Sequence, residues 1–247
     1  MLAIEESAAH RFLSGLGKIL PRPKAIIVIS AHWESTGEPT VSLAPHPDTI
    51  HDFDGFPEEL FEIRYPAPGA PSVAIRAAAL LEREGLDVGR NPTRGLDHGA
   101  WVPLRLIYPE ADIPVAQISL RRGAPPSENE RMGIALRELS EDGVLVIGSG
   151  SLTHNLYAFR GASINAVVPS WVSDFGAWMH DRLLTNERED LLNYRTRAPF
   201  AVRNHPTEEH LLPLFVAMGA AGDPPRAERL HASYEYGGLA MDVYSFS

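Results

Sequence analysis

Two histidines follow apolar runs, at places where buried strands of a sheet are expected to end. The run IIVIS at residues 26–30 leads into His32, and the run VLVIG at 144–148 leads through a Gly/Ser turn to His154. In open α/β sheets, ligands bind at the carboxyl ends of such strands. A histidine there can be a metal ligand or an acid–base group, or it can simply bond to a neighbouring carbonyl. Taken alone, His32 fits both interpretations.

Two further histidines lie near expected helix starts. In GLDHGAWVPL, Asp97 can cap a helix that begins near His98. In NHPTEEHLLPLF, Pro206 suits the first turn of a helix predicted over 206–220, and Pro213 is expected to kink that helix near His210. Either histidine alone is also compatible with a purely structural role.

Taken together, the four histidines favour a functional site over four separate structural roles, because strand ends and helix starts can converge at one edge of an α/β sheet. Neutral imidazoles are common ligands of iron, zinc and copper, so the pattern predicts a metal site. The chain has no cysteine, no G-x-S-x-G, no H-E-x-x-H and no P-loop. GSGSLT lacks the third glycine of a dinucleotide-binding loop. A serine triad that uses His154 or His98 stays open as an alternative.

The elements that must position these side chains alternate along the chain. Interleaved strands and helices indicate an α/β fold with a central, mostly parallel or mixed sheet flanked by helices. No linker divides the sequence, so we expect one domain over 1–247. Strands are expected at 25–30, 40–43, 113–120, 143–147 and near 239–244, and helices at 5–20, 72–84, 127–140, 170–184 and 206–220.

Charge and hydropathy exclude several classes of function. The formal net charge of −10 argues against a partner that binds through a phosphate backbone, so no nucleic acid is expected. No apolar stretch is long enough to cross a membrane. The segment MLAIEESAAHRF has two acids and no basic region typical of a secretory signal, so we expect a cytoplasmic protein. The oligomeric state is left open.

Several motifs occur in order through nearly the whole chain, and they share one resemblance. They are SAHWES, HDFDGFP with YPAPGAP, GLDHGAWVPL, GSGSLTHNL and HPTEEHLLPL. Together they resemble the DOPA 4,5-extradiol dioxygenase family, within the class III (LigB-like) extradiol ring-cleaving enzymes. The resemblance implies an oxidoreductase that opens the ring of a catechol, such as DOPA, with O2 as the second substrate.

The same resemblance assigns roles to the histidines. It implies that His32 and His210 hold a non-haem metal, Fe(II) for activity with Zn²⁺ as a possible bound ion. It further implies that His154 is the acid–base catalyst and that His98 helps to hold substrate or oxygen. An all-histidine site differs from the 2-His-1-carboxylate pattern and is compatible with zinc as well as iron.

The substrate contacts are expected around the mouth of the pocket. HDFDGFP and YPAPGAP would line it, and the candidate residues that read the substituents of the aromatic diol are Trp33, Phe53, Phe56 and Arg64.

The beginning of the sequence departs from the resemblance. The family has an additional first strand that ends in His-Gly-Ser-Pro and supplies a third metal ligand, whereas MLAIEESAAHRF resembles the segment that follows it. Three explanations of the missing ligand are open. The natural protein starts further upstream, a residue such as His51 or Glu209 substitutes as ligand, or the chain no longer catalyses. A shortened sheet would also expose an edge or an apolar groove.

Two alternatives to a dioxygenase remain at this point. One is a zinc-dependent hydrolase that uses zinc-bound hydroxide at the same histidines. The other is a catalytically impaired binding protein on the same scaffold. Oxygen consumption distinguishes both from a dioxygenase.

Overall fold

The computed structural model describes residues 1–247, and its centre is a five-stranded sheet in the order β3-β2-β4-β1-β5. Strand β1 pairs in parallel with both β4 and β5, whereas β2 pairs in parallel with β3 and antiparallel with β4. The sheet is therefore mixed, as expected from the sequence. The strands are β1 Ala25–Ser35, β2 Thr40–Ser42, β3 Gly89–Asn91, β4 Val115–Arg121 and β5 Val144–Ser149.

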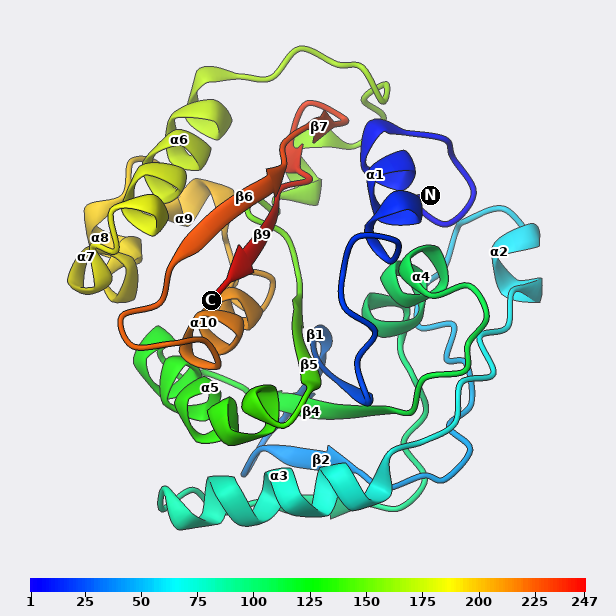
Figure 1. Ribbon diagram of the computed structural model, residues 1–247. Coiled ribbons are helices and arrows are strands. Elements are labelled where there is room, and N and C mark those ends of the chain that lie inside the picture. Colours follow the sequence, from blue (N-terminus) through cyan, green and yellow to red (C-terminus); the bar gives the residue numbers. More distant parts are fainter.

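Strand β1 is buried on both faces because helices cover both sides of the sheet. Ile26 and Val28 pack into one hydrophobic cluster with residues of α1 and α4, and Ile27 and Ile29 pack into a second cluster with α3, α5 and α10. Figure 1 shows these two groups of helices on opposite sides of the strands. Their bounds are α1 Ala8–Leu16, α3 Pro71–Arg83, α4 His98–Ile107, α5 Pro126–Glu141 and α10 Leu212–Gly219.

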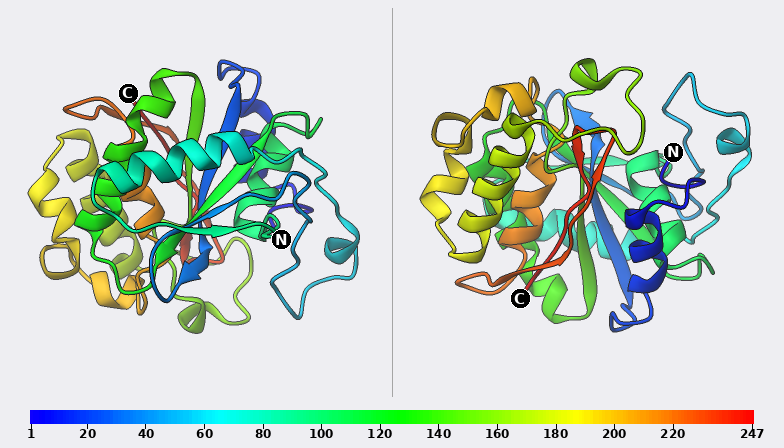
Figure 2. Two further views of the ribbon diagram at one scale, coloured as in Figure 1. Left: turned by 90° about the horizontal axis from the view of Figure 1, so that it is seen from below. Right: turned by 90° about the horizontal axis from the view of Figure 1, so that it is seen from above.

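The remaining elements surround this layered centre. Helices α6 to α9 form a group beyond α5 and α10, in yellow and gold in Figure 2. Two short ribbons, β6–β9 and β7–β8, end the chain. None of the helices is both long and apolar enough to cross a bilayer. The bounds are α2 Glu59–Glu62, η1 Leu156–Phe159, α6 Ser170–Leu184, α7 Arg188–Leu192, α8 Tyr194–Arg197, α9 Ala201–Asn204, β6 Ala227–His231, β7 Tyr234–Glu235, β8 Leu239–Ala240 and β9 Val243–Phe246.

Two expectations that bear on the site are corrected. Strand β1 does not end at Ser30 but continues to Ser35, with a register shift against β4 between Ile29 and Glu34, so His32 lies in the irregular part of the strand. The last helix begins at Leu212 rather than 206, with Pro213 in its first turn. A proline lacks the N–H that a helix interior needs, and the first turn does not need it. The predicted kink is therefore wrong, and His210 lies in the turn before α10.

Two of the expected elements near the ends of the chain also differ, and one strand was not expected. The first helix is shorter than predicted and begins after Ser7, whose hydroxyl accepts a hydrogen bond from the backbone N–H of His10 at 3.1 Å. The late strand near 239–244 is divided between β8 and β9, which belong to separate ribbons. The short strand β3 was not predicted.

Candidate functional site

The four histidines singled out from the sequence meet in a row. The ring centroids of His98 and His32 are 3.8 Å apart, and those of His32 and His210 are 5.0 Å apart at an interplanar angle of 81°. His154 stacks on His210 with centroids 3.4 Å apart and the rings nearly parallel. His32 and His210 are 178 positions apart in the sequence, so the fold assembles the cluster from β1, the start of α4, the segment after β5 and the turn before α10.

A buried polar network fixes β1 against α4 beside the cluster. Ser30 Oγ accepts a hydrogen bond from the backbone N–H of His32 at 3.2 Å and donates one to Asp97 Oδ1 at 2.6 Å. Asp97 is fully buried and caps α4 by accepting from the N–H of Ala100. Its other oxygen accepts from Gln117 Nε2 at 2.8 Å. The capping role expected of Asp97 is confirmed, and the carboxylate also connects the strand of His32 to the helix of His98.

Two glycines permit the close approach of the segments that carry the histidines. A Cβ on Gly99 would lie 2.2 Å from Ser30 Oγ and 3.0 Å from His32 Cδ2. A Cβ on Gly150 would lie 2.1 Å from the carbonyl oxygen of His210. The N–H of Ser151 donates to that same carbonyl at 2.8 Å. Only glycine therefore lets the turn after β5 lie directly against the backbone of His210.

Desolvation lowers the basicity of two of the rings. The pKa of His32 falls to about 4 because the surrounding protein desolvates the charged ring, although the residue remains exposed, and because the neighbouring His98 and His210 add to the effect. Burial, followed by the proximity of His210 and His205, lowers the pKa of His154 to about 3. Both rings are unprotonated at neutral pH, which is the form that binds metals.

Two rings of the row, those of His98 and His210, have a carboxylate bonded to a ring nitrogen. Asp52 Oδ1 lies 2.9 Å from His98 Nδ1, and Glu209 Oε1 lies 3.0 Å from His210 Nδ1. The hydrogen bond from His210 lowers the pKa of Glu209 to about 2. Burial opposes ionisation of Asp52, but the hydrogen bonds from His98 outweigh it and bring its pKa to about 2. Carboxylates in this position orient metal-binding or catalytic imidazoles.

The donor set fits a divalent metal ion. One group comprises the ligand atoms of His32, Asp52 and His98, which lie within 4.8 Å of one another, and the corresponding atoms of His154, Glu209 and His210 form a second such group. Imidazole nitrogens supported by carboxylates are ligands that iron and zinc share. Glu209, one of the expected substitute ligands, is therefore at the site. The other, His51, faces away and bonds to the carbonyl of Ile63 at 3.0 Å.

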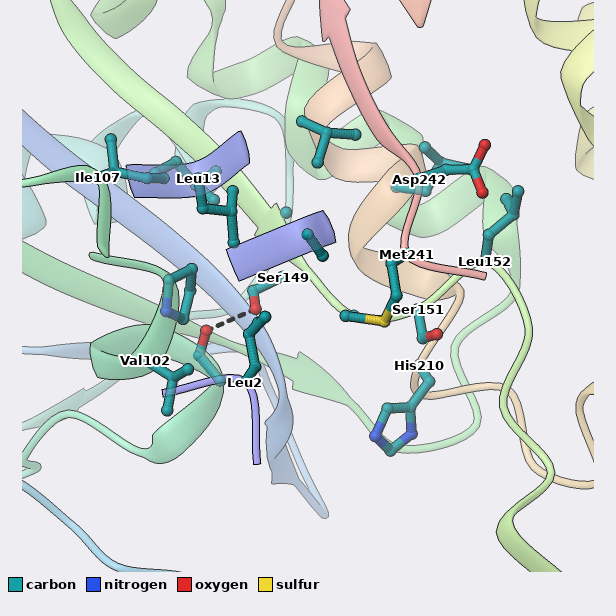
Figure 3. Close-up of a pocket in the computed structure, with 18 of the residues that line it drawn as sticks. Leu2, Leu13, Val102, Ile107, Ser149, Ser151, Leu152, His210, Met241 and Asp242 are labelled. Carbon is teal, nitrogen blue, oxygen red and sulfur yellow. Dashed lines mark hydrogen bonds between the residues drawn. The ribbon is translucent and has the colours of Figure 1, made fainter. Parts of the chain in front are cut away.

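A cavity of about 620 Å³ opens beside the histidine row. His32, His98 and His210 line its polar end, and Figure 3 shows His210 pointing toward it below Met241. His154 is not among the lining residues, because it lies behind the ring of His210. The cavity is otherwise mostly apolar, which suits an aromatic guest.

The four expected substrate contacts fall in different places. Phe53 and Phe56 line the cavity, with ring centroids 5.5 Å apart. Trp33 is buried under the guanidinium of Arg94, 4.9 Å from its ring, and does not line the cavity. Arg64 is exposed and donates to the carbonyl of Phe61. The structure thus brings Phe53 and Phe56 to the site, but not Trp33 or Arg64.

The far part of the cavity runs along β5, which is an edge strand of the sheet. Leu145 and Ile147 of β5 line it together with Leu2 and Leu13 from the N-terminal region. Figure 3 shows Leu2 and Leu13 beside the end of β5. This part of the cavity is therefore walled by apolar side chains from β5 and from the N-terminal region.

Asp52 is the site residue that sequence reasoning missed. It lies 46 positions before His98, and no local pattern connects the two. The signal available in the sequence was the acid within HDFDGFP, a motif that was assigned only to the pocket mouth.

Comparisons with known proteins agree on one family. The family described as the catalytic LigB subunit of aromatic ring-opening dioxygenase matches residues 11–246. A 4,5-DOPA dioxygenase extradiol from Beta vulgaris is 44% identical over 251 residues, which cover 100% of this chain and 92% of the relative. Its counterpart from Mirabilis jalapa is 40% identical, covering 96% and 89%. A crystal structure of an uncharacterized Escherichia coli K12 protein matches with a TM-score of 0.80 and 30% identity, covering 98% of this chain and 93% of that one.

Proposed function

This chain belongs to the family of the catalytic LigB subunit of aromatic ring-opening dioxygenases, and on that basis we propose that it opens the ring of a catechol, with DOPA as a candidate substrate. It is an extradiol dioxygenase, for which an aromatic compound and O2 are the two substrates. The observation that best supports a catechol is the row of four histidines at one end of a largely apolar cavity. The apolar part accepts the ring, and the imidazoles meet the hydroxyls. We take residues 1–247 as one catalytic domain.

His32 and His210 are the proposed metal ligands, with Fe(II) as the active ion and Zn²⁺ as a possible occupant. Their rings lie close together at a steep angle, and Glu209 holds His210 Nδ1 so that Nε2 is left for the metal. When bound, the ion supplies Lewis acidity toward the diol and the redox chemistry that activates O2.

His154 is the proposed acid–base residue. It stacks on His210 at the end of the row, and its lowered pKa keeps the ring in the unprotonated form that can accept a proton. In this role it accepts a proton from the diol and returns it to the opened product. His98, on the other side of His32, holds the substrate from the cavity wall.

Phe53 and Phe56 are the proposed contacts for the aromatic ring. They lie edge to face with each other, and Phe53 also packs edge to face on His98 with centroids 5.4 Å apart. A ring that enters between these side chains and the histidines is offered aromatic contact on one side and imidazoles on the other. Trp33 and Arg64 do not line the cavity, so their positions do not support such a role for them.

Oxygen uptake tests the proposal. The purified chain is loaded anaerobically with Fe(II) and offered a panel of catechols that includes DOPA, with tyrosine as the matched control because it lacks the second hydroxyl. We expect O2 consumption and a yellow ring-opened product with at least one catechol and none with tyrosine. Absence of O2 consumption across the panel, with the metal shown to be bound, would contradict the proposal.

A further inference from the structure

The side chain of Asp52 makes two contacts with one residue of the site. Its Oδ1 accepts a hydrogen bond from the backbone N–H of His98 at 2.9 Å and lies 2.9 Å from His98 Nδ1. The first of these contacts supplies a partner to an N–H at the start of α4, which has none within the helix. The second reaches the ring itself. One carboxylate oxygen therefore holds both the backbone and the imidazole of His98.

The loop that carries Asp52 is fixed rather than free. The N–H of Ile50 donates to the carbonyl of Leu96 at 2.8 Å, and the N–H of Leu96 donates to the carbonyl of Asp48 at 2.7 Å. Trp101 Nε1 donates to the carbonyl of Ile50 at 2.8 Å. The segment before Asp52 is thus tied to the segment before His98 and to α4. The Asp52 carboxylate is placed by backbone pairing two residues away, not by chance contact at the surface.

The ring of His98 is held on its faces as well. His32 lies 3.8 Å from it, and Phe53, the neighbour of Asp52, meets it edge to face. With Nδ1 occupied by Asp52, the other ring nitrogen, Nε2, has no hydrogen-bond partner in the protein. His98 lines the cavity, so this nitrogen is the one available to a ligand there.

We propose that Asp52 is a positioning residue for His98, which it holds with Nδ1 protonated and Nε2 available to accept a hydrogen bond from a hydroxyl of the aromatic substrate. A carboxylate can only accept hydrogen bonds, so Nδ1 must be the donor in this pair. A neutral imidazole that donates from one nitrogen accepts at the other. His98 Nε2 then accepts a hydrogen bond from a substrate hydroxyl, and Asp52 determines that Nε2 rather than Nδ1 is the acceptor. The inference rests on the proposed function for its catalytic consequence, but not for the state of the ring.

Two measurements on Asp52→Ala, with Asp54→Ala as matched control, test this inference. Asp54 lies on the same loop and is exposed; although it belongs to HDFDGFP, it does not line the cavity and forms no hydrogen bond or ion pair with the histidine row. In metal-free protein labelled with ¹⁵N-histidine, the signals of His98 are assigned by their loss in His98→Gln. We expect wild type and Asp54→Ala to show a protonated Nδ1 and an unprotonated Nε2, and Asp52→Ala to show a mixture of the two tautomers.

The second measurement is steady-state oxygen uptake with a catechol. We expect kcat/KM of Asp52→Ala to fall roughly 10–100-fold, the range typical of lost supporting carboxylates, with Asp54→Ala close to wild type. Asp52→Asn keeps an oxygen that can accept from Nδ1, so it should recover part of both the tautomer and the rate. An unchanged tautomer in Asp52→Ala, or a fall in kcat/KM no larger than that of Asp54→Ala, would overturn the inference. Because the tautomer is read without metal or substrate, failure of the proposed activity leaves that test intact.

Discussion

At the scale of single residues, the histidines of the row have separable tasks. His210 is the proposed metal ligand and His154 the proposed proton acceptor, although their rings are stacked at 3.4 Å. A metal ligand and an acid–base residue differ in what their loss removes. Loss of the ligand empties the site, whereas loss of the acid–base residue leaves a filled site that turns over slowly.

We therefore expect His210→Ala and His154→Ala to fail in different ways. In His210→Ala, calorimetry should show strongly weakened binding of Fe(II) or Zn²⁺. In His154→Ala, metal affinity should stay near wild type while kcat falls about 10²–10⁴-fold, the usual contribution of a general acid–base. The control is His46→Ala, an exposed histidine outside the row. Equal loss of metal binding in both variants would refute the acid–base role of His154.

The residue scale also shows what a sequence can reveal about a site. His32, His98, His154 and His210 were recognisable because each lies close to an apolar run or a helix-start signal that can be located from local patterns, even where the predicted bounds of β1 and α10 were wrong. Asp52 was not, because its partner is 46 positions away and the backbone pairs that bring them together lie in loops. A supporting contact of this kind depends on tertiary structure rather than on any local period.

At the scale of elements, the turn after β5 sets the position of the segment that carries His210. Gly148 packs against the carbonyl of Pro213, and Gly150 packs against the carbonyl of His210. The sequence predicted strands β2, β4 and β5 and helices α3, α5 and α6 closely, because each has a clear period or a clear cap. It misplaced the start of α10, because Pro206 and Pro213 both suit a first turn and only packing against β5 decides between them.

We expect Gly150→Ala to damage metal binding without unfolding the protein. The added Cβ would meet the carbonyl oxygen of His210 at 2.1 Å, so the turn carrying the ligand must move. Weaker binding of Fe(II) or Zn²⁺ and a lower kcat should follow, while far-ultraviolet circular dichroism stays near wild type. Gly37→Ala is the matched control, because a Cβ there meets nothing within 4 Å. If Gly150→Ala bound metal as well as Gly37→Ala, the turn would not be what positions His210.

At the scale of the whole molecule, the two ends of the chain close the apolar part of the cavity. Tyr236 donates to Glu5 at 2.8 Å, and Phe12 of α1 stacks on His231 of β6. Leu2 and Val243 contribute to the same lining as Ile147 of β5. Such a cavity could not be outlined from the sequence, because its walls come from elements at both ends and in the middle of the chain.

One charged residue in this wall carries a cost that depends on pH. Asp242 lines the cavity between β8 and β9, and its side chain is only 5% exposed. Burial raises its pKa from 3.8 to about 6, although Arg229, 3.5 Å away, opposes the rise. Tyr234 and Tyr244 also lie near this carboxyl group. Because the folded state holds the proton more tightly than the unfolded state, stability falls as pH rises from about 4 to about 6, and the full penalty remains above that range.

Asp242→Asn should therefore stabilise the protein at high pH but not at low pH. The pKa difference corresponds to at most about 3 kcal/mol in the free energy of unfolding at pH 8, reduced by loss of the Arg229 pair, and to almost nothing near pH 4. Urea unfolding at both pH values measures it. Asp112→Asn is the control, because Asp112 forms an exposed pair with Arg22 and its pKa is lowered, so its removal should bring no gain at pH 8. If Asp242→Asn raised the free energy of unfolding equally at pH 4 and pH 8, ionisation of Asp242 would not be the source of the penalty. The pKa of Asp242 in the cavity wall would then be close to its value in water.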